Sequence, residues 1–310
     1  MRALVTGGAG FIGSNLADGL LARGAEVRIF DNLSTGFREN VSAKAELLEG
    51  DIRDEAAVRK AVAGMDVVFH KAAMRAVLQS VQDPLSVDLA NTHGTLLVLK
   101  AAQDAGVRRV VAASSSSIYG GAKQLPTPES APLVPRSPYA VSKLAGEQYC
   151  RVWAELFGLE TVALRYFNVY GPRQRPDSAY AAVIPLFTRA LRTGARPVVH
   201  GDGLQSRSFA YIDDVVEANL AAAAAPARAC SGKAYNIAGS HSYTLIQLLE
   251  EVGSILGVKV DPEHTDPRAG DIRHSSADLT AAAHDLGWAP TIDISDGLRR
   301  TVDWFAGRES

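Results

Sequence analysis

The stretch that decides the fold is "RALVTGGAGFIGSNLADGL", residues 2–20. It has the order of a strand, a glycine-rich turn and a helix. Gly7 allows a tight turn, Gly10 lets the backbone approach a pyrophosphate, and Gly13 permits the helix to pack closely on the strand. The same spacing also occurs in ordinary turns, so the rest of the chain has to decide whether it binds a dinucleotide.

Strands and helices alternate over the first two-thirds of the chain. Short β-branched runs predict strands at 3–6, 26–30, 46–49, 67–70, 109–113 and 161–166. Amphipathic stretches predict helices at 14–23, 55–62 and 92–105. This alternation predicts an α/β fold, a doubly wound parallel sheet with helices on both faces.

The alternation breaks after about residue 168. Gly/Pro-rich connections follow, namely "VYGPRQRPDSAY", "RTGARPVVHGDGLQ" and "DPRAGD". Long polar loops beyond the strand ends of an α/β sheet are where ligand lobes are built. We expect a dinucleotide-binding Rossmann domain of residues 1–167 plus about 208–238, in which a helix at 213–225 and a strand at 234–237 return to the sheet. A smaller C-terminal α/β lobe, about 168–207 and 239–310, is expected to bind the substrate.

Composition and charge exclude several classes of protein. The 310 residues are 47% hydrophobic and 21% charged, which is typical of a soluble globular protein. The 32 basic and 34 acidic residues give a net charge of −2, so no global field attracts nucleic acid or an anionic membrane. The N-terminus runs straight into a strand without a secretion signal, and "ANLAAAAAPARAC" is too short to span a bilayer.

The two cysteines, Cys150 and Cys230, indicate no redox or metal chemistry. There is no CxxC and no cysteine–histidine pair at zinc spacing. Cys150 continues the helical pattern after Lys143, where a small buried hydrophobe is the simpler interpretation. We expect a reduced, cytoplasmic protein without a metal site.

An acidic residue follows the second predicted strand. In "IFDNLSTG", Asp31 lies 18 residues beyond Gly13, near the spacing of a carboxylate that binds the adenosine ribose 2′-OH. It would repel a 2′-phosphate, which favours NAD over NADP; Arg38, the first cation after it, fits a solvated loop residue better. After the third strand, "GDIRD" would place Asp51 and Ile52 at the adenine edge, although the fragment alone could also be a helix N-cap.

The motif "SPYAVSK", residues 137–143, puts Tyr139 and Lys143 four positions apart, on one face of a helix. A free phenol has a pKa of about 10 and is a poor base at neutral pH. A lysine ammonium and the positive ring of oxidised NAD would both favour the phenolate. Lowering the pKa by roughly three units corresponds to about 4 kcal/mol. We expect Tyr139 to act as general base for an alcohol.

A run of serines lies upstream of this helix. "RRVVAASSSSIYG" brings Ser114 to Ser117 to the C-terminal edge of the sheet, where their hydroxyls could orient a substrate alcohol beside Tyr139. Taken alone, a serine run can simply indicate a turn, and a YxxxK spacing can arise by chance on the face of any helix. Their order around a dinucleotide loop favours the functional interpretation.

Related motifs extend over essentially the whole chain: GGAGFIG, "HKAA" at 70–73, SSSSIYG, PYAVSK, "RYFNVYGPRQ" at 165–174, "RSFAYIDDVV" at 207–216 and "RAGDIRHSSADL" at 268–279. With them, the sequence resembles the extended short-chain dehydrogenase/reductase family, and most of all its UDP-hexose 4-epimerases. The resemblance implies a tightly held NAD, a UDP-sugar in the C-terminal lobe, and a homodimer through a four-helix bundle to which each subunit gives the helices at 92–105 and 138–157.

The chemistry that the resemblance implies has no net redox change. Tyr139 takes the 4-OH proton while hydride passes from C4 to NAD; the 4-keto sugar turns over, and hydride returns to its other face. Ser115 shares the 4-OH, and Lys143 holds the nicotinamide ribose and tunes Tyr139. The implied cofactor-binding residues are Gly7, Gly10, Phe11, Ile12, Gly13, Asp31, Asn32, Asp51, Ile52, Ala72, Ala73, Tyr139, Lys143 and Tyr166.

Substrate-binding residues follow from the same resemblance. Arg207 and Arg268 fall where the family clamps the diphosphate, and Asp271 where a carboxylate accepts from the uridine ribose. Asn168 matches a residue that bonds a diphosphate oxygen, and His200 lies beside the uracil position. The set is completed by Arg75, Ser115, Ser116, Val183 and Ser275. Lone arginines are usually solvated surface, and that interpretation is kept for Arg173, Arg175, Arg189, Arg192 and Arg196.

The choice of reaction rests on absent carboxylates. Related 4,6-dehydratases carry an Asp–Glu pair where this chain has Ser116 and Ser117, because eliminating water needs an extra acid and base. Epimerisation is therefore favoured over dehydration or decarboxylation. Another sugar-nucleotide reductase or dehydratase, and a non-catalytic NAD-binding regulator, are the alternatives from other classes.

The choice of sugar rests on Ser275, which stands where epimerases confined to glucose and galactose tend to have a tyrosine. A serine leaves room for a 2-N-acetyl group, and "SAYAAVIPLF" at 178–187 resembles members that act on N-acetylated UDP-sugars. UDP-GlcNAc and UDP-GalNAc are favoured, with UDP-Glc and UDP-Gal as further substrates. A UDP-glucuronate 4-epimerase stays open, because SSSSIYG is common there and Arg75 or Arg273 could receive a carboxylate.

Overall fold

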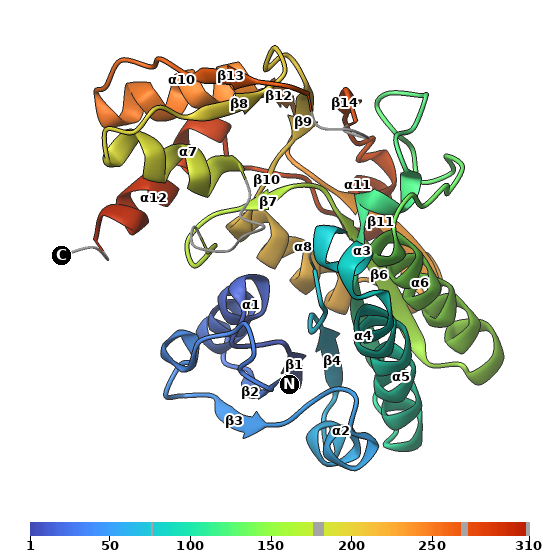
Figure 1. The fold of residues 1–310 in the computed structure, drawn as a ribbon. Coiled ribbons are helices and arrows are strands. Elements are labelled where there is room, and N and C mark those ends of the chain that lie inside the picture. Colours follow the sequence, from blue (N-terminus) through green and yellow to red (C-terminus); the bar gives the residue numbers. More distant parts are fainter. Residues whose placement is uncertain (76, 176–182, 268–271, 308–310) are drawn as a thin grey trace.

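A seven-stranded parallel sheet forms the centre of the protein (Figure 1). The computed structural model describes residues 1–75, 77–175, 183–267 and 272–307. The strand order is β11-β6-β5-β4-β1-β2-β3, and each neighbouring pair is parallel. The strands are β1 (Arg2–Thr6), β2 (Glu26–Asp31), β3 (Glu46–Glu49), β4 (Val67–His70), β5 (Arg109–Ser115), β6 (Glu160–Tyr166) and β11 (Lys233–Ile237). This is the doubly wound sheet that the sequence predicted.

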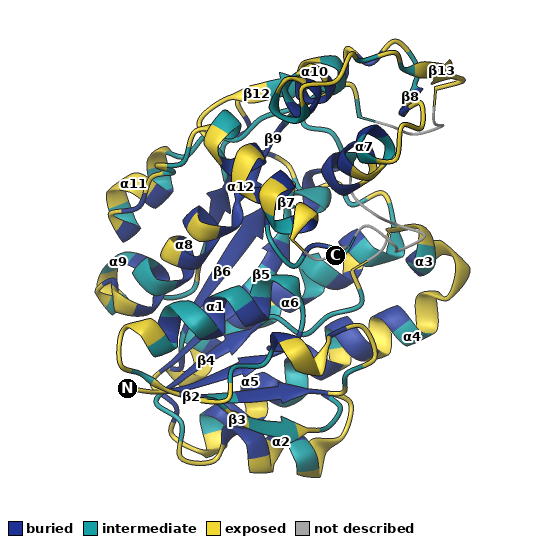
Figure 2. Ribbon diagram, turned by 90° about the vertical axis from the view of Figure 1, so that its left-hand side faces the viewer, coloured by how far each residue is buried: buried dark blue, intermediate teal, exposed yellow. Residues whose placement is uncertain are grey.

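Helices cover both faces of the sheet, as Figure 2 shows. One face packs against α1 (Phe11–Ala22) and α8 (Ile212–Ala224), through apolar residues such as Leu16 and Val215. The other packs against α2 (Glu55–Val62), α5 (Gly94–Asp104) and α6 (Pro138–Phe157), through residues such as Leu99 and Trp153. The central strands are buried on both faces, which explains their nearly continuous apolar runs.

The glycines of the first loop are required by close approach. Gly7 has a φ of +68°, a left-handed conformation that other residues rarely adopt. A Cβ added at Gly13 would lie 2.1 Å from the carbonyl oxygen of Gly7, so only glycine lets α1 begin directly on the turn after β1. The helix starts at Phe11, three residues earlier than the sequence predicted.

The predicted return of later segments to the sheet is confirmed. β11 pairs with β6 at one edge, and α8 packs beside α1. The helix predicted at 92–105 is the last part of a longer helical segment, in which α4 (Pro84–Asp88) continues through a π-helical turn η2 (Leu89–His93) into α5. β5 runs to Ser115, two residues further than predicted, and so carries that serine to the sheet edge.

The remaining elements form smaller layers, seen above the main sheet in Figure 1 and along its helical flank. A three-stranded sheet has the order β12-β9-β14, and β10-β7 and β13-β8 are two-stranded. Their bounds, with those of the remaining helices, are η1 (Arg38–Asn40), α3 (Val77–Gln82), η3 (Ser116–Tyr119), β7 (Val169–Tyr170), α7 (Val183–Arg192), β8 (Val198–His200), β9 (Ser206–Ser208), β10 (Ala210–Tyr211), α9 (Ala227–Cys230), β12 (Ser242–Thr244), α10 (Leu245–Leu256), β13 (Glu263–Thr265), β14 (His274–Ser275), α11 (Thr280–Leu286) and α12 (Ile294–Ala306). Within the described ranges, no helix has the length and apolar character needed to cross a membrane.

Candidate active site

The C-terminal end of β5 meets the first turns of α6. Ser137 caps this helix by accepting from the backbone N–H of Ala140, and Pro138 occupies its first turn. The helix therefore begins just before Tyr139, whose side chain lies close enough to Ser115 for the serine hydroxyl to act on the pKa of the phenol. The structure thus brings two of the three predicted catalytic residues into contact.

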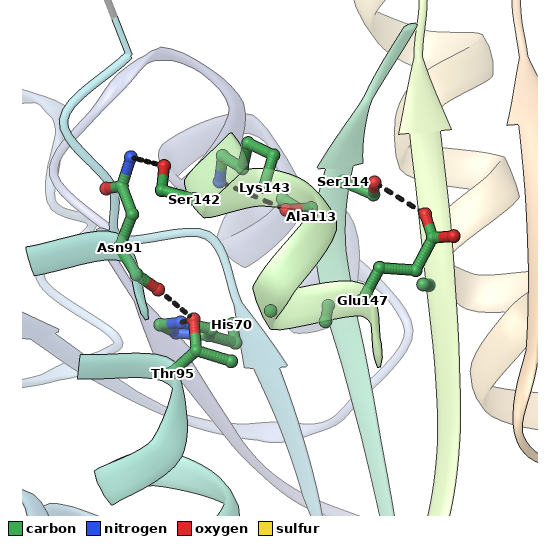
Figure 3. A pocket seen from close by; sticks show the side chains of 11 residues that line it. His70, Asn91, Thr95, Ala113, Ser114, Ser142, Lys143 and Glu147 are labelled. Carbon is green, nitrogen blue, oxygen red and sulfur yellow. Dashed lines mark hydrogen bonds between the residues drawn. The ribbon is translucent and has the colours of Figure 1, made fainter. Parts of the chain in front are cut away.

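Lys143 lies one turn further along the same face of α6. Its Nζ donates to the backbone carbonyl of Ala113 at 3.0 Å (Figure 3). Another turn on, Glu147 accepts from the hydroxyl of Ser114 at 2.8 Å. Successive turns of the helix are therefore bonded to the last residues of the strand, which fixes the register between them.

The pKa values in this site are governed by burial. Burial raises the pKa of the Tyr139 phenol, while the bond to Ser115 and the charge of Arg75 act in the other direction. Burial lowers the pKa of Lys143 to about 8. The expectation from sequence was a lowered pKa for Tyr139, with the positive nicotinamide ring supplying part of the charge; in the protein alone, desolvation of the phenolate outweighs the nearby cations.

Ser115 ends β5 and caps the short helix η3. Its Oγ accepts from the backbone N–H of Ser117 at 3.2 Å and from the hydroxyl of Ser117 at 2.9 Å. Ser116 lies half-buried in the same turn. The serine run therefore forms a turn, and it also places hydroxyls at the edge of the sheet.

A chain of buried hydrogen bonds lies behind Lys143. His70 contacts Thr6 through Nδ1 (2.8 Å) and Thr95 through Nε2 (3.0 Å), and Thr95 donates to the carbonyl of Asn91 at 2.5 Å. The amide of Asn91 in turn donates to Ser142, the neighbour of Lys143, at 3.0 Å (Figure 3). Burial lowers the pKa of His70 to about 3, so the ring is neutral and serves as a structural link.

Sequence reasoning missed a buried ion pair and a partly buried lysine near the site. Arg165 on β6 pairs with Glu147 at 2.6 Å. Lys71, directly after β4, donates to the carbonyl of Val111 and to the hydroxyl of Tyr166, each at 3.1 Å, and burial lowers its pKa well below the usual value. The position of Glu147, four residues after Lys143, was the only signal in the sequence that could have pointed to the first pair.

The glycine loop forms a cradle without room for side chains. A Cβ at Gly7 would lie 2.7 Å from the backbone nitrogen of Ala72, so the loop and the segment after β4 meet backbone to backbone. Ala73 follows in this segment, and Phe11 and Ile12 open α1 on the other side of the loop. Such a cradle fits the pyrophosphate of a dinucleotide.

The acidic residues predicted for the adenosine end lie beside this loop. Asp31 is buried, and its oxygens accept from the backbone N–H groups of Ala9 (2.9 Å) and Leu33 (2.8 Å). Asn32 donates to Asp51 at 2.8 Å. Arg38 pairs with Glu49 at 2.6 Å. Ile52 is buried, and a Cβ on Gly94 of α5 would meet its side chain at 2.9 Å.

Several candidate substrate residues gather around the sheet β12-β9-β14. Ser275 on β14 is the register partner of Arg207 on β9. The amide of Asn168 donates to the carbonyl of Ser208, the next residue of β9, at 2.9 Å. His200 ends β8, where its Nδ1 contacts Thr265 at 2.8 Å. Arg268 and Asp271 lie outside the described residues.

Several of the other arginines interact with groups of the protein itself. Arg273 forms a bidentate pair with Asp202, at 2.7 and 2.8 Å. Arg75 is exposed between β4 and α3, and it lies close enough to Tyr139 to act on the pKa of the phenol. Val183 is the first residue of α7. Arg173 pairs with Asp18, Arg175 lies over the ring of Phe37, Arg192 donates to the carbonyl of Phe305, and Arg196 pairs with Asp261.

The part of the chain that the structure describes contains no candidate metal centre. No group of three or more His, Cys, Asp or Glu side chains there could hold an ion. Cys150 and Cys230 are both buried, and burial raises the pKa of Cys150 to about 12. The interpretation of Cys150 as a core residue is confirmed.

Comparisons with known proteins agree with this geometry. Residues 3–238 match the model of the NAD dependent epimerase/dehydratase family. A UDP-glucose 4-epimerase of Mycolicibacterium smegmatis is 39% identical over 99% of both chains. Two crystallised relatives cover the fold. One is a UDP-N-acetylglucosamine 4-epimerase from Methanobrevibacter ruminantium in complex with UDP-N-acetylmuramic acid, with 38% identity, a TM-score of 0.93 and coverage of 99% of this chain and 98% of that chain.

The other is a UDP-glucose 4-epimerase of Thermus thermophilus in complex with NAD, with 36% identity, a TM-score of 0.90 and coverage of 99% and 100%. The family match covers most of the chain, and the relatives cover nearly all of it. The resemblance seen in the sequence motifs is confirmed. The chain is therefore an enzyme of the NAD-dependent epimerase/dehydratase family, with the extended short-chain dehydrogenase/reductase fold and with NAD as its cofactor.

Proposed function

We propose that the protein is a UDP-hexose 4-epimerase that interconverts UDP-GlcNAc and UDP-GalNAc, and also UDP-Glc and UDP-Gal. The observation that carries the proposal is the contact of Tyr139 with Ser115 at the end of β5, with Lys143 one turn along α6. This set lies at the carboxyl edge of the same sheet that carries the glycine cradle. In open α/β sheets, that edge is where cofactor and substrate meet.

In the proposed reaction, Tyr139 takes the proton of the sugar 4-OH and later returns it. Ser115 donates a hydrogen bond to the same sugar oxygen while it becomes a keto oxygen. Lys143 holds its place against the Ala113 carbonyl and keeps positive charge near the phenol. NAD held in the glycine cradle would supply the hydride acceptor for C4 and the hydride donor for its return to the other face of the sugar. The cycle therefore needs no external oxidant or reductant.

The cradle residues are proposed to hold NAD rather than NADP. Asp31 has acceptor capacity left on its carboxylate, since each oxygen accepts one backbone hydrogen bond and has a further lone pair. A 2′-phosphate would be repelled there. Arg38, the first cation after Asp31 in the sequence, is paired with Glu49. The other proposed cofactor residues are those of the glycine loop, with Asn32, Asp51, Ile52, Ala72, Ala73 and Tyr166.

Ser275 supports the acetylated sugars, because a small side chain beside Arg207 leaves room at the sugar end of a clamped diphosphate. Ser116 and Ser117 support epimerisation over dehydration, since neither can act as the extra acid and base. UDP-glucuronate remains the second candidate, and Arg75 is the observation in its favour, because its charge acts at Tyr139. Arg273 does not favour it, because its guanidinium is already paired with Asp202.

We further propose the two-part organisation, with residues 1–167 and about 208–238 binding NAD and the remainder binding the UDP-sugar, and a cytoplasmic homodimer. The dimer proposal rests on exposed apolar side chains along the helical flank of α3 to α6. They are Val77, Leu78, Val81, Leu85, Leu89 and Val141. Exposed apolar side chains gathered on neighbouring helices are typical of a subunit interface.

The purified protein, given UDP-GlcNAc, UDP-Glc or UDP-GlcA separately and no added cofactor, tests the proposal. We expect C4 epimers of the first two, resolved by chromatography or NMR. Tyr139→Phe should lose turnover while keeping its fold and its NAD content. A deoxy-keto product, a demand for added NAD(P)H, or full activity of Tyr139→Phe would overturn the proposal; turnover of UDP-GlcA alone would favour the second candidate.

A further inference from the structure

The hydrogen bonds of Ser115 leave it only one role. A serine hydroxyl has one proton to donate and two lone pairs that accept. Both lone pairs of Ser115 are used by Ser117, through its backbone N–H (3.2 Å) and its hydroxyl (2.9 Å). What remains is the proton of Ser115 itself, which can only be donated.

Ser115 lies close enough to Tyr139 to act on the pKa of the phenol. A hydroxyl whose two lone pairs are both taken can act on the phenolate only as a donor. With both lone pairs of Ser115 taken by Ser117, an accepted proton from Tyr139 would need a third lone pair. The side chain of Ser117 is thus what removes the alternative.

Ser117 itself is held firmly. It lies in η3 between Ser115 and the buried residues Ile118 and Tyr119. The turn ends at Gly120, which has a φ of +63° and where a Cβ would lie 1.9 Å from the carbonyl of Val134. Tyr119 is tied to Asn236 by a hydrogen bond of 2.7 Å. The turn cannot rotate to release Ser115 without breaking these contacts.

We propose that Ser117 is a positioning residue, which fixes Ser115 as a hydrogen-bond donor to the reacting oxygens of Tyr139 and the sugar. This inference rests on the proposed 4-epimerase function. When the sugar 4-OH approaches, it cannot donate to Ser115, so Tyr139 is the acceptor left for its proton. As Tyr139 takes up the proton and negative charge develops on the sugar oxygen, the one proton of Ser115 can turn from the phenol to that oxygen. Ser117 therefore sets the direction of proton transfer.

Three variants of the holoenzyme test this: Ser117→Ala, Ser117→Cys and Ser117→Thr. The measurement is the pH profile of kcat and of kcat/KM with UDP-GlcNAc or UDP-Glc, with NAD content and circular dichroism as checks on folding. The charged groups that face Tyr139 are Arg75, with Arg175 beside it, and Lys143 on the same helix; all are unchanged in these variants.

For Ser117→Ala we expect kcat to fall roughly tenfold and the acid limb of the profile to move to higher pH by about half a unit or more, because the phenolate loses an oriented donor. KM should stay within about threefold. Ser117→Thr keeps the hydroxyl, so its acid limb and its kcat should both match those of the wild type. Ser117→Cys should lie between the Ala and Thr variants in both quantities. If Ser117→Ala does not fold, the Cys and Thr pair decides alone.

If Ser117→Ala lost activity equally at every pH, with the acid limb of its pH profile unchanged, Ser117 would have a merely structural role and the inference would be overturned. A Thr variant as impaired as the Ala variant would also overturn it. Tyr139→Phe separates this from failure of the proposed function: if it is inactive while Ser117→Ala keeps the wild-type profile, only the role of Ser117 is wrong. If Tyr139→Phe is active, the proposed function fails first.

Discussion

Ser114 donates its hydroxyl proton to Glu147 at 2.8 Å, and this bond ties the strand that carries Ser115 to the helix that carries Tyr139. The remaining bonds of the carboxylate go to Arg165, at 2.6 and 3.0 Å, and both charged side chains are 6% exposed. The distance between the catalytic strand and helix is therefore maintained by a buried ion pair rather than by apolar packing alone.

Glu147→Gln should destabilise the fold strongly. The amide keeps the shape but leaves Arg165 as a buried charge without its counter-ion, which costs about 3–5 kcal/mol. Ser114→Ala, which removes one neutral donor, should cost about 1 kcal/mol. Urea denaturation of each variant measures these changes.

The matched control is Glu217→Gln, which breaks the Arg23–Glu217 pair, whose side chains are each 50% exposed. A surface pair of this kind contributes about 0–1 kcal/mol. A Glu147→Gln variant no less stable than Glu217→Gln would contradict the role given to the buried pair.

Lys143→Met should stabilise the NAD-free protein at neutral pH. Burial lowers the pKa of Lys143 from 10.5 to about 8. Between these values the unfolded chain binds more protons, so the stability of the wild type rises with pH there. At pH 7 the folded protein has to hold a protonated, desolvated amine, and methionine removes that free-energy cost. After subtraction of the lost hydrogen bond to Ala113, the free energy of unfolding should rise by about 2 kcal/mol.

The gain from Lys143→Met should shrink as the pH rises from 8 to 10.5, which denaturant curves at several pH values measure. A constant difference across this range would mean that the amine is not desolvated in the folded protein. The variant is expected to lose epimerase activity whatever its stability.

Much of the fold could be predicted because it depends on local patterns. The strands of the main sheet and the turn at Gly7 and Gly13 follow from periodicity and from backbone conformations that neighbouring residues determine. Tyr139 and Lys143 could be placed on one face because four residues make about one helical turn. Where the pattern was ambiguous, at Leu89–His93, the helix starts earlier and passes through a π-helical turn that no propensity indicates.

The rest depends on segments far apart in the sequence. Arg273 forms an ion pair with Asp202, which lies 71 residues away in the sequence. No local pattern predicts whether a lone arginine binds a substrate or pairs with another residue of the chain. The direction of the pKa shift at Tyr139 also could not be predicted, because the sequence shows nearby charges and not the extent of burial. Burial turned out to be the larger effect.

Removing two negative charges should shift cofactor preference toward NADP. In Asp31→Asn combined with Glu49→Gln, the repulsion of a 2′-phosphate is removed and Arg38 is released from its partner. The ratio of NADP to NAD affinity should rise by about 10- to 100-fold, corresponding to the loss or gain of one charged hydrogen bond. Calorimetric titration of NAD-free protein measures both affinities.

Glu49→Gln alone serves as the control for the cofactor experiment. Asp31 still repels the phosphate in that variant, so the preference for NAD should change little. If the single and the double variant behave alike, Asp31 does not determine the choice.

Ser275→Tyr should narrow the sugar range. The side chain would fill the space beside Arg207, and a 2-N-acetyl group is larger than a 2-hydroxyl. We expect kcat/KM for UDP-GlcNAc to fall roughly tenfold more than that for UDP-Glc. His274→Tyr, at the neighbouring position whose side chain alternates to the other face of β14, is the matched control. Equal losses for both sugars would contradict the pocket argument.

Leu85→Glu should separate the proposed dimer into monomers. Leu85 is 82% exposed on α4 and lies among the apolar side chains of the α3 to α6 flank. A carboxylate buried there on association costs several kcal/mol, so sedimentation velocity at micromolar concentration should show a shift from dimer to monomer. Leu186→Glu, on α7 and 42% exposed, adds the same charge away from this flank and should leave the dimer intact. A monomeric wild type would rule out the dimer, and equal behaviour of the two variants would place the interface elsewhere.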